Sequence, residues 1–312
     1  MNGNPGYVDL QVNGYGGVDF NQDQLTAEAL HLACQRLQAD GVAGILATII
    51  TDRLELMERR LAQLTALRAA DPLAREIVWG IHIEGPFING SPGFVGAHPP
   101  AAVRPAEPDV MQQLLDAADG LVRLVTLAPE CDHSLHVTRM LAEQGIVVSA
   151  GHCDPSLEQL RAAIDAGLSM FTHLGNACPA ILPRHDNIIQ RVLSQSDRLS
   201  ISFIADGAHV PLFALGNYLR AAGMEHCVVV TDAISAAGLG PGRYPIGSQM
   251  AEVGEDLVPR APGQAHLMGS ATTMPRMAEN LQRHLKLSAG EIRLLLRDNP
   301  RRTLGLPPGG SP

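Results

Sequence analysis

Four ionisable residues follow short apolar segments that are far apart in this 312-residue chain, and their types suit hydrolysis at a metal ion. Glu84 lies near the end of the run IVWGIHIEG, His152 follows IVVSAG, His173 follows AGLSMFT and Asp232 follows CVVVT. A catalytic zinc ion typically takes three ligands from His and Asp or Glu and keeps a fourth position for water. We therefore predict that Glu84, His152 and His173 hold one divalent metal ion.

Asp232 is the candidate for proton transfer. Cleavage of an amide needs a proton taken from water and delivered to the departing nitrogen, and a carboxylate beside the metal can do both. His209, in the segment FIADGAHV, is a candidate to hydrogen-bond the substrate oxygen as negative charge develops on it. Taken singly, each of these residues could instead be a helix cap or a satisfied polar group. Their common position after apolar runs favours a shared site.

Two neutral amides point to a single metal ion. Barrel hydrolases with two metals often carry an HxH pair on the first strand, whereas this chain has Gln11 and Asn13 there, on one strand face. Amides are poor ligands for a second transition metal. His82 lies two residues before Glu84 on the same strand face, and we expect it deeper in the barrel in a structural role.

Eight apolar runs bounded by Gly, Pro or Asp predict strands, at 7–12, 43–49, 77–83, 121–127, 146–150, 168–172, 199–204 and 227–230. Amphipathic stretches between or after them predict helices, at 25–38, 54–69, 109–118, 134–143, 156–166, 212–221, 272–284 and 288–297. This alternation predicts an α/β fold, a (β/α)8 TIM barrel whose active site lies at the C-terminal strand ends. A doubly wound sheet is disfavoured because the Gly-rich turn QVNGYGGVDF lacks GxGxxG spacing.

Length and composition favour one catalytic barrel domain over residues 1–306, with a hairpin or lid at 236–270 and a disordered tail at 307–312. The net charge of −9 argues against a broad nucleic-acid or anionic-membrane surface. No apolar stretch approaches the roughly 20 residues needed to cross a bilayer, and the N-terminus lacks signal-peptide features. The five cysteines have no CxxC spacing. We expect a cytoplasmic protein without disulfides.

Eight segments in order resemble the N-acetylglucosamine-6-phosphate deacetylases of the amidohydrolase superfamily: VDLQVNGYGGVDF, GIHIEGPFI, VTLAPE, GIVVSAGHCDPS, FTHLGNACP, FIADGAHV, VTDAISAAG and MGSATTM. The resemblance implies that Glu84, His152 and His173 hold a divalent metal, usually zinc, and that Asp232 is the general base and acid. It also implies that His209 contacts the scissile acetamide. For the sugar phosphate, the resemblance implies contacts from Asn176, the backbone of Ala177 and Arg184, with the loop residue His98 near the pocket.

The chain departs from the family pattern in two places. The family's R-E-P-G run is replaced by PRHDNIIQ, which keeps Arg184 in a new context where His185 and Asp186 could reshape the sugar pocket or cap a helix. Only six residues precede Tyr7, and the chain stops at Pro312, so we expect a short form without the family's small β-sandwich. By resemblance, a homodimer is plausible. The alternatives are an amidohydrolase acting on another N-acetylated sugar or a cyclic amide, and a catalytically silent sugar-phosphate-binding barrel.

Overall fold

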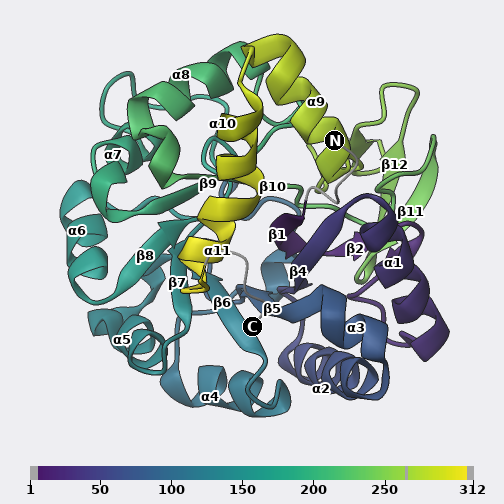
Figure 1. The fold of residues 1–312 in the computed structure, drawn as a ribbon. Helices are drawn as coiled ribbons and strands as arrows, with labels where there is room; N and C mark the ends of the chain where they lie inside the picture. Colours follow the sequence, from purple (N-terminus) through teal and green to yellow (C-terminus); the bar gives the residue numbers. More distant parts are fainter. Residues whose placement is uncertain (1–5, 264–265, 308–312) are drawn as a thin grey trace.

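Eight parallel strands form a barrel surrounded by helices in the computed structural model, which describes residues 6–263 and 266–307 (Figure 1). In spatial order the strands are β1 (Tyr7–Val12), β4 (Val42–Ile50), β5 (Val78–Glu84), β6 (Val122–Leu127), β7 (Val147–Ala150), β8 (Leu168–Phe171), β9 (Ser200–Ile204) and β10 (Cys227–Val230). The predicted TIM barrel is confirmed. The bounds of β1 and β10 match the prediction to the residue, and the other strands differ from it by one residue at one or both ends.

The strands could be recognised in the sequence because most are buried on both faces. Eight of the nine residues of β4 are buried, and so is every residue of β5 and β10. A parallel strand covered by helices outside and by side chains inside appears as a nearly continuous apolar run. The runs of β5, β7, β8 and β10 end at or just before the candidate site residues, at the open end of the barrel.

The helices lie outside the barrel, where most of the amphipathic stretches predicted them. They are α1 (Ala27–Ala39), α2 (Leu54–Ala70), α3 (Pro72–Ile77), α4 (Pro108–Ala117), α5 (His136–Glu143), α6 (Leu157–Asp165), α7 (Ile188–Leu193), α8 (Leu212–Ala222), α9 (Met274–Leu285), α10 (Ala289–Arg293) and α11 (Asn299–Thr303). The sequence did not predict α3, and it indicated α7 only as a helix that His185 or Asp186 could cap. Both helices have six residues, and the N-cap of α7 is Asn187. None of the helices in the described ranges combines the length and hydropathy of a membrane span.

The prediction of the last helix, 288–297, is wrong about where the helix ends and about its regular α-helical geometry. The helical path runs from α10 through a π-helical segment, η6 (Leu294–Asp298), into α11. Pro300 lacks the N–H that would continue an α-helical ladder, and the helix widens immediately before it. The predicted tail at 307–312 lies, apart from residue 307, outside the described residues.

A small antiparallel sheet lies within the Gly- and Pro-rich stretch 236–270. It contains β11 (Gly242–Ile246), β12 (Gln249–Val253) and β13 (Pro259–Arg260), while β2 (Gly14–Tyr15) and β3 (Val18–Asp19) form a separate short ribbon after β1. The small sheet packs through a second apolar cluster that includes Ile50, Ile234, Ile246, Val253 and Met268. This cluster joins the sheet to the barrel, and Ile246 also reaches the cavity at the open end of the strands.

The barrel closes between β1 and β10 through a buried carboxylate. Asp9 accepts hydrogen bonds from the backbone N–H of Thr231 at 3.1 Å and from its hydroxyl at 2.5 Å. Further along, Val12 and Ala233 form a parallel bridge, and the N–H of Asn13 donates to the carbonyl of Ala233 at 2.7 Å. The side chain of Asp9 thus joins the two strands below the point at which their backbones pair.

Asp9→Asn should change how the stability of the protein depends on pH. Burial raises the pKa of Asp9 from 3.8 to about 7, so between these pH values the folded protein holds a proton that the unfolded chain has released. The stabilisation from this proton is complete below about pH 4 and is lost as pH rises towards 7. The free energy of unfolding of the wild type should therefore fall relative to the variant by up to about 1.4 kcal/mol per pH unit. Urea unfolding at several pH values would measure this, and a pH-independent difference would contradict it.

Candidate metal centre and active site

A cavity of about 410 Å³ opens at the C-terminal ends of the barrel strands. This volume lies in the ordinary range for small-molecule sites. The cavity brings together eight of the nine residues predicted from the sequence: Glu84, His98, His152, His173, Asn176, Ala177, His209 and Asp232. Arg184 is the exception, because it is exposed on the loop between β8 and α7 and is not among the described residues that line the cavity.

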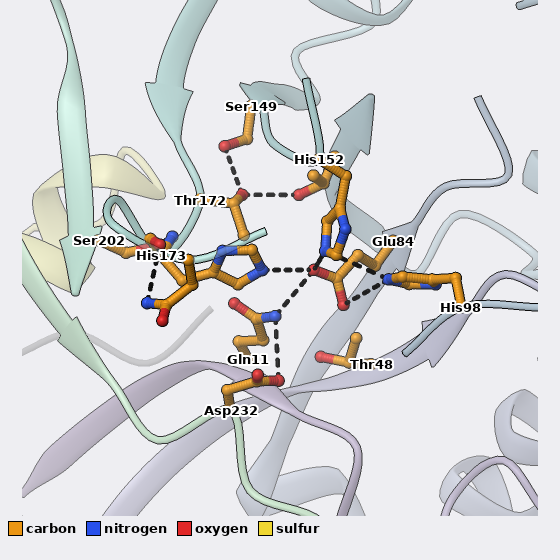
Figure 2. A network of polar contacts seen from close by, with 12 residues as sticks. Gln11, Thr48, Glu84, His98, Ser149, His152, Thr172, His173, Ser202 and Asp232 are labelled. Carbon is orange, nitrogen blue, oxygen red and sulfur yellow. Dashed lines mark hydrogen bonds and ion pairs between the residues drawn. The ribbon is translucent and has the colours of Figure 1, made fainter. Parts of the chain in front are cut away.

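The carboxylate of Glu84 lies at the centre of the cluster (Figure 2). Its Oε1 is 3.0 Å from Nε2 of His173 and 3.3 Å from Nε2 of His152, and it accepts a hydrogen bond from the side-chain amide of Gln11 at 3.0 Å. Burial by itself would raise the pKa of Glu84, but the contacts with the two histidines outweigh it and hold the pKa well below its usual range. The same carboxylate raises the pKa of His173 against the effect of burial.

The protonation of His152 can be deduced from its partners. Its Nδ1 is 2.8 Å from the carbonyl oxygen of Phe94, an acceptor, so Nδ1 carries a hydrogen. In the neutral ring, Nε2 then presents a lone pair to the carboxylate oxygen of Glu84 at 3.3 Å. Two electron-rich atoms face each other at this distance most favourably with a cation between them. Anchoring of the second ring nitrogen is also typical of metal-ligating histidines.

The distances fit a divalent metal ion. Ligand atoms about 2.0–2.1 Å from one tetrahedral zinc ion lie about 3.3 Å from each other. The separations of Nε2 of His173 and of His152 from Oε1 of Glu84, 3.0 and 3.3 Å, are close to this value. Ligand atoms of Glu84, His98 and His152 also all lie within 4.8 Å of one another. Glu84 and His152 are common to this group and to the predicted set, and His173 adjoins them through its 3.0 Å contact with Glu84.

Besides Ala177, whose φ is 49°, three site residues that follow strand ends have a left-handed backbone, which non-glycine residues rarely adopt. The φ angles are 51° at His152, 35° at His173 and 50° at Asp232, each just beyond the end of a strand. Such residues cost about 1–3 kcal/mol each and persist where their surroundings hold them. Each is held by a neighbouring segment. The holding bonds run from Asn89 N–H to the His152 carbonyl at 2.9 Å, from His173 N–H to Ser202 Oγ at 2.8 Å, and from Ser270 N–H to the Asp232 carbonyl at 2.9 Å.

Asp232 lies beside the cluster and is positioned by two side-chain amides, one from Gln11 on β1 and one from Asn13, the residue after β1. Its Oδ1 accepts from the side chains of Asn13 at 2.7 Å and Gln11 at 3.1 Å. Burial, and then the negative charge of Glu84, raise the pKa of Asp232 to about 6. Gln11 therefore donates to two carboxylates from one amide group. Its N–H groups stand where the two carboxylates face each other, which supports the prediction of a single metal ion.

His209 has an acidic partner that was not identified from the sequence. Its Nδ1 is 2.7 Å from Oδ2 of Asp206, and the other carboxylate oxygen of Asp206 accepts from the backbone N–H groups of Ala208 and His209 at 2.9 Å. Burial would raise the pKa of Asp206, but His209 and these N–H groups lower it. The motif FIADGAHV contained this signal, because Asp three residues before His in a turn can reach the His ring.

His82 is structural, as expected. Its Nδ1 is 3.2 Å from the hydroxyl of Thr48 and its Nε2 is 2.8 Å from the hydroxyl of Thr126. Burial lowers the pKa of His82 to about 4, which keeps the ring neutral. The hydroxyl of Thr126 is also hydrogen-bonded to that of Thr172 at 2.8 Å, and the hydroxyl of Thr172 to that of Ser149 at 2.7 Å. A chain of buried hydroxyl groups thus extends the polar contacts of His82.

Glu130, in the segment VTLAPE, anchors the backbone on which His152 lies, and the sequence alone gave it no role. Its Oε1 accepts from the side chain of Asn89 at 3.0 Å and from the N–H of Asp154 at 2.5 Å. Asn89 in turn donates its backbone N–H to the carbonyl of the strained residue His152. One carboxylate thus ties the loop after β5 to the loop after β7.

The eight-stranded parallel barrel carries its Glu and His cluster at the C-terminal strand ends, where enzymes of the (β/α)8 barrel class build their active sites. The chain is 37% identical over 279 residues to the N-acetylglucosamine-6-phosphate deacetylase of Bos taurus, covering 86% of this chain and 66% of that protein. It is 31% identical to the Bacillus subtilis enzyme of the same name, covering 97% of this chain and 75% of that one. The chain thus spans about two thirds to three quarters of the length of these relatives.

Solved structures agree with these relatives. A point mutant of the Mycobacterium smegmatis N-acetyl-D-glucosamine-6-phosphate deacetylase, in complex with N-acetyl-D-glucosamine-6-phosphate, superposes with a TM-score of 0.88 at 32% identity, over 97% of this chain and 78% of that one. No protein-family model matches the chain. The chain belongs to the N-acetylglucosamine-6-phosphate deacetylase family.

Glu130→Ala should weaken metal binding. Without the carboxylate, the loops that hold His152 in its left-handed conformation lose their common anchor, and we expect about 10–100-fold lower affinity for Zn²⁺ or Co²⁺, as for other residues that support metal ligands. Chelator competition would measure the affinity. Glu130→Gln, which keeps one acceptor oxygen, should lie between Ala and the wild type. Glu143→Ala, at an exposed position of α5, is the matched control. Unchanged affinity in Glu130→Ala would exclude the anchoring role.

Proposed function

We propose that this protein hydrolyses the N-acetyl group of N-acetylglucosamine 6-phosphate, giving glucosamine 6-phosphate and acetate. The observation that carries the proposal is the position of Asp232, a part-buried carboxylate beside the Glu84 and histidine cluster, in a cavity of about 410 Å³. Membership of the deacetylase family supports the substrate class.

We assign the metal to Glu84, His152 and His173, and we propose zinc, because one carboxylate and two imidazoles are a common catalytic zinc set. When bound, the ion supplies an activated water and polarises the acetamide carbonyl. The protein's own part is to keep the two imidazole nitrogens 3.0 and 3.3 Å from Oε1 of Glu84 and to fix the His152 ring through Phe94.

Asp232 is assigned as the proton shuttle. The hydrogen bonds from Gln11 and Asn13 both end on Oδ1, so we assign the proton to Oδ2. Burial and the charge of Glu84 raise the pKa of this carboxylate to about 6, so it binds a proton more strongly than an exposed aspartate and can still release it. That balance suits a group which accepts the proton of the attacking water and returns it to the departing amine.

His209 is assigned to the oxygen of the acetamide. Because Asp206 accepts from Nδ1, Nε2 is the ring atom left to face the substrate oxygen. Asn176 and the backbone of Ala177 line the cavity after β8, and we assign them to the sugar phosphate.

We propose a cytoplasmic homodimer. All five cysteines, each within the described residues, are unpaired, which agrees with a reducing compartment. Ile181 and Phe213 expose 91% and 77% of their surface, and they lie in segments that follow the neighbouring strands β8 and β9. Two large apolar side chains exposed after adjacent strands support a contact with a second copy of the chain.

Acetate release is the direct test. The protein should release acetate from N-acetylglucosamine 6-phosphate with bound zinc, lose the activity after chelation and regain it when zinc is returned. Asp232→Asn should lower kcat by about 10²–10⁴-fold and still bind the metal, because it keeps the shape of the side chain. No turnover by the zinc-loaded wild type would favour a sugar-phosphate-binding barrel without catalysis. Turnover unaffected by chelation would exclude the metal site.

Arg184→Ala tests the need for phosphate. Arg184 is exposed and follows the cavity-lining residues 175–178 by six positions, and we assign its guanidinium to the phosphate of the substrate. We expect the KM for N-acetylglucosamine 6-phosphate to rise about 10-fold, the size of a charged hydrogen bond, and the KM for free N-acetylglucosamine to stay constant. Arg59→Ala, at an exposed position of α2, is the control. Equal changes for the two sugars would remove Arg184 from phosphate binding and favour the alternative of an unphosphorylated substrate.

A further inference from the structure

His98 lies closer to the cluster of Glu84 and His152 than contact with substrate alone would require. Its side chain is buried, and its Nε2 is 3.3 Å from Nε2 of His152 and 4.0 Å from Oε2 of Glu84. The two imidazole rings stand perpendicular, with centroids 4.4 Å apart. Figure 2 shows His98 on the side of Glu84 opposite to His173, pointing towards the same carboxylate.

The proton positions restrict what His98 can do. Phe94 fixes the hydrogen of His152 on Nδ1, so the lone pair of that ring is on Nε2, facing His98. An N–H of His98 directed at this lone pair would compete with a metal ion for it. When a metal ion binds Nε2 of His152, the most favourable arrangement of His98 directs the lone pair of its Nε2 at the same ion. The Nδ1 of His98 is buried and has no hydrogen-bond partner among the described residues, so the His98 ring lacks the anchor that Phe94 gives His152.

We propose that His98 is a fourth metal ligand of the substrate-free protein and that substrate displaces it. This inference rests on the proposed metal site and deepens it. Four protein ligands would close the open position that a catalytic zinc ion needs, so His98 must leave the ion for reaction to occur.

The loop that carries His98 suits such an exchange. It leads from β5 through Gly93 and Gly96, which have φ angles of 90° and 58°. A side chain at Gly96 would begin 3.0 Å from the ring of His152, so the loop passes directly over the ligand. The side chain of Gln249, on β12, donates to the carbonyl of Ala97 at 2.6 Å and connects this loop to the small sheet beside the cavity.

Cobalt substitution would test the proposal without relying on activity. The Co²⁺ form of the wild type should show the visible absorption of a four-coordinate ion. His98→Ala and His98→Gln should change this spectrum and lower the affinity for Co²⁺ by about 10–100-fold or more. Removing a residue that only supports a ligand already costs about 10–100-fold, and removing a ligand should cost at least as much. His284→Ala, which removes an exposed imidazole from α9, should leave both unchanged. Adding glucosamine 6-phosphate to the wild type should move its spectrum towards that of the His98 variants.

A double variant makes the test sharper. If His98 is a ligand, His173→Ala should still bind one Co²⁺ through Glu84, His98 and His152, and the additional change His98→Ala should abolish binding. If the wild type binds Co²⁺ and both His98 variants show the same spectrum and affinity as the wild type, His98 is not a ligand. The proposed function would then remain intact. A wild type that binds no Co²⁺ would overturn both.

Discussion

The seam between β1 and β10 fixes the geometry on which the site depends. Asp9 joins the two strands through the N–H and hydroxyl of Thr231, and the next residue of the chain after Thr231 is Asp232. On the other side of the seam, two residues beyond Asp9, Gln11 reaches both Asp232 and Glu84. A shift of β10 by one residue along β1 would separate Thr231 from Asp9 and move Asp232 away from the side-chain amides of Gln11 and Asn13.

The positions of the site residues could be predicted from the sequence, while their partners could not. Strands buried on both faces appear as apolar runs, and the residues that end these runs must meet at one end of the barrel. This logic located Glu84, His152, His173 and Asp232. The roles assigned to them remain predictions that metal and activity measurements have to test.

The contacts that were missed depend on loop conformation. Glu130 reaches the loop of His152 across two strand ends, and His98 folds back over the same histidine from a long loop after β5. Apolar periodicity carries no information about such paths. The left-handed backbone of the site residues was equally invisible, since nothing in the residue types of His152, His173 or Asp232 demands a positive φ. The π-helical segment before Pro300 could not be predicted for a related reason, because the local apolar pattern there is that of an ordinary α-helix.

The strained backbone at three strand ends has a consequence for transplanting this chemistry into other barrels. Each left-handed residue is held by a group from a different segment of the chain: Asn89, Ser202 and Ser270. Copying only the metal ligands and the carboxylate onto a new barrel would leave these residues free to relax into ordinary extended backbone, with their side chains turned out of the cavity. The smallest unit that can be moved between scaffolds is therefore the site residue together with the neighbouring group that hydrogen-bonds its backbone.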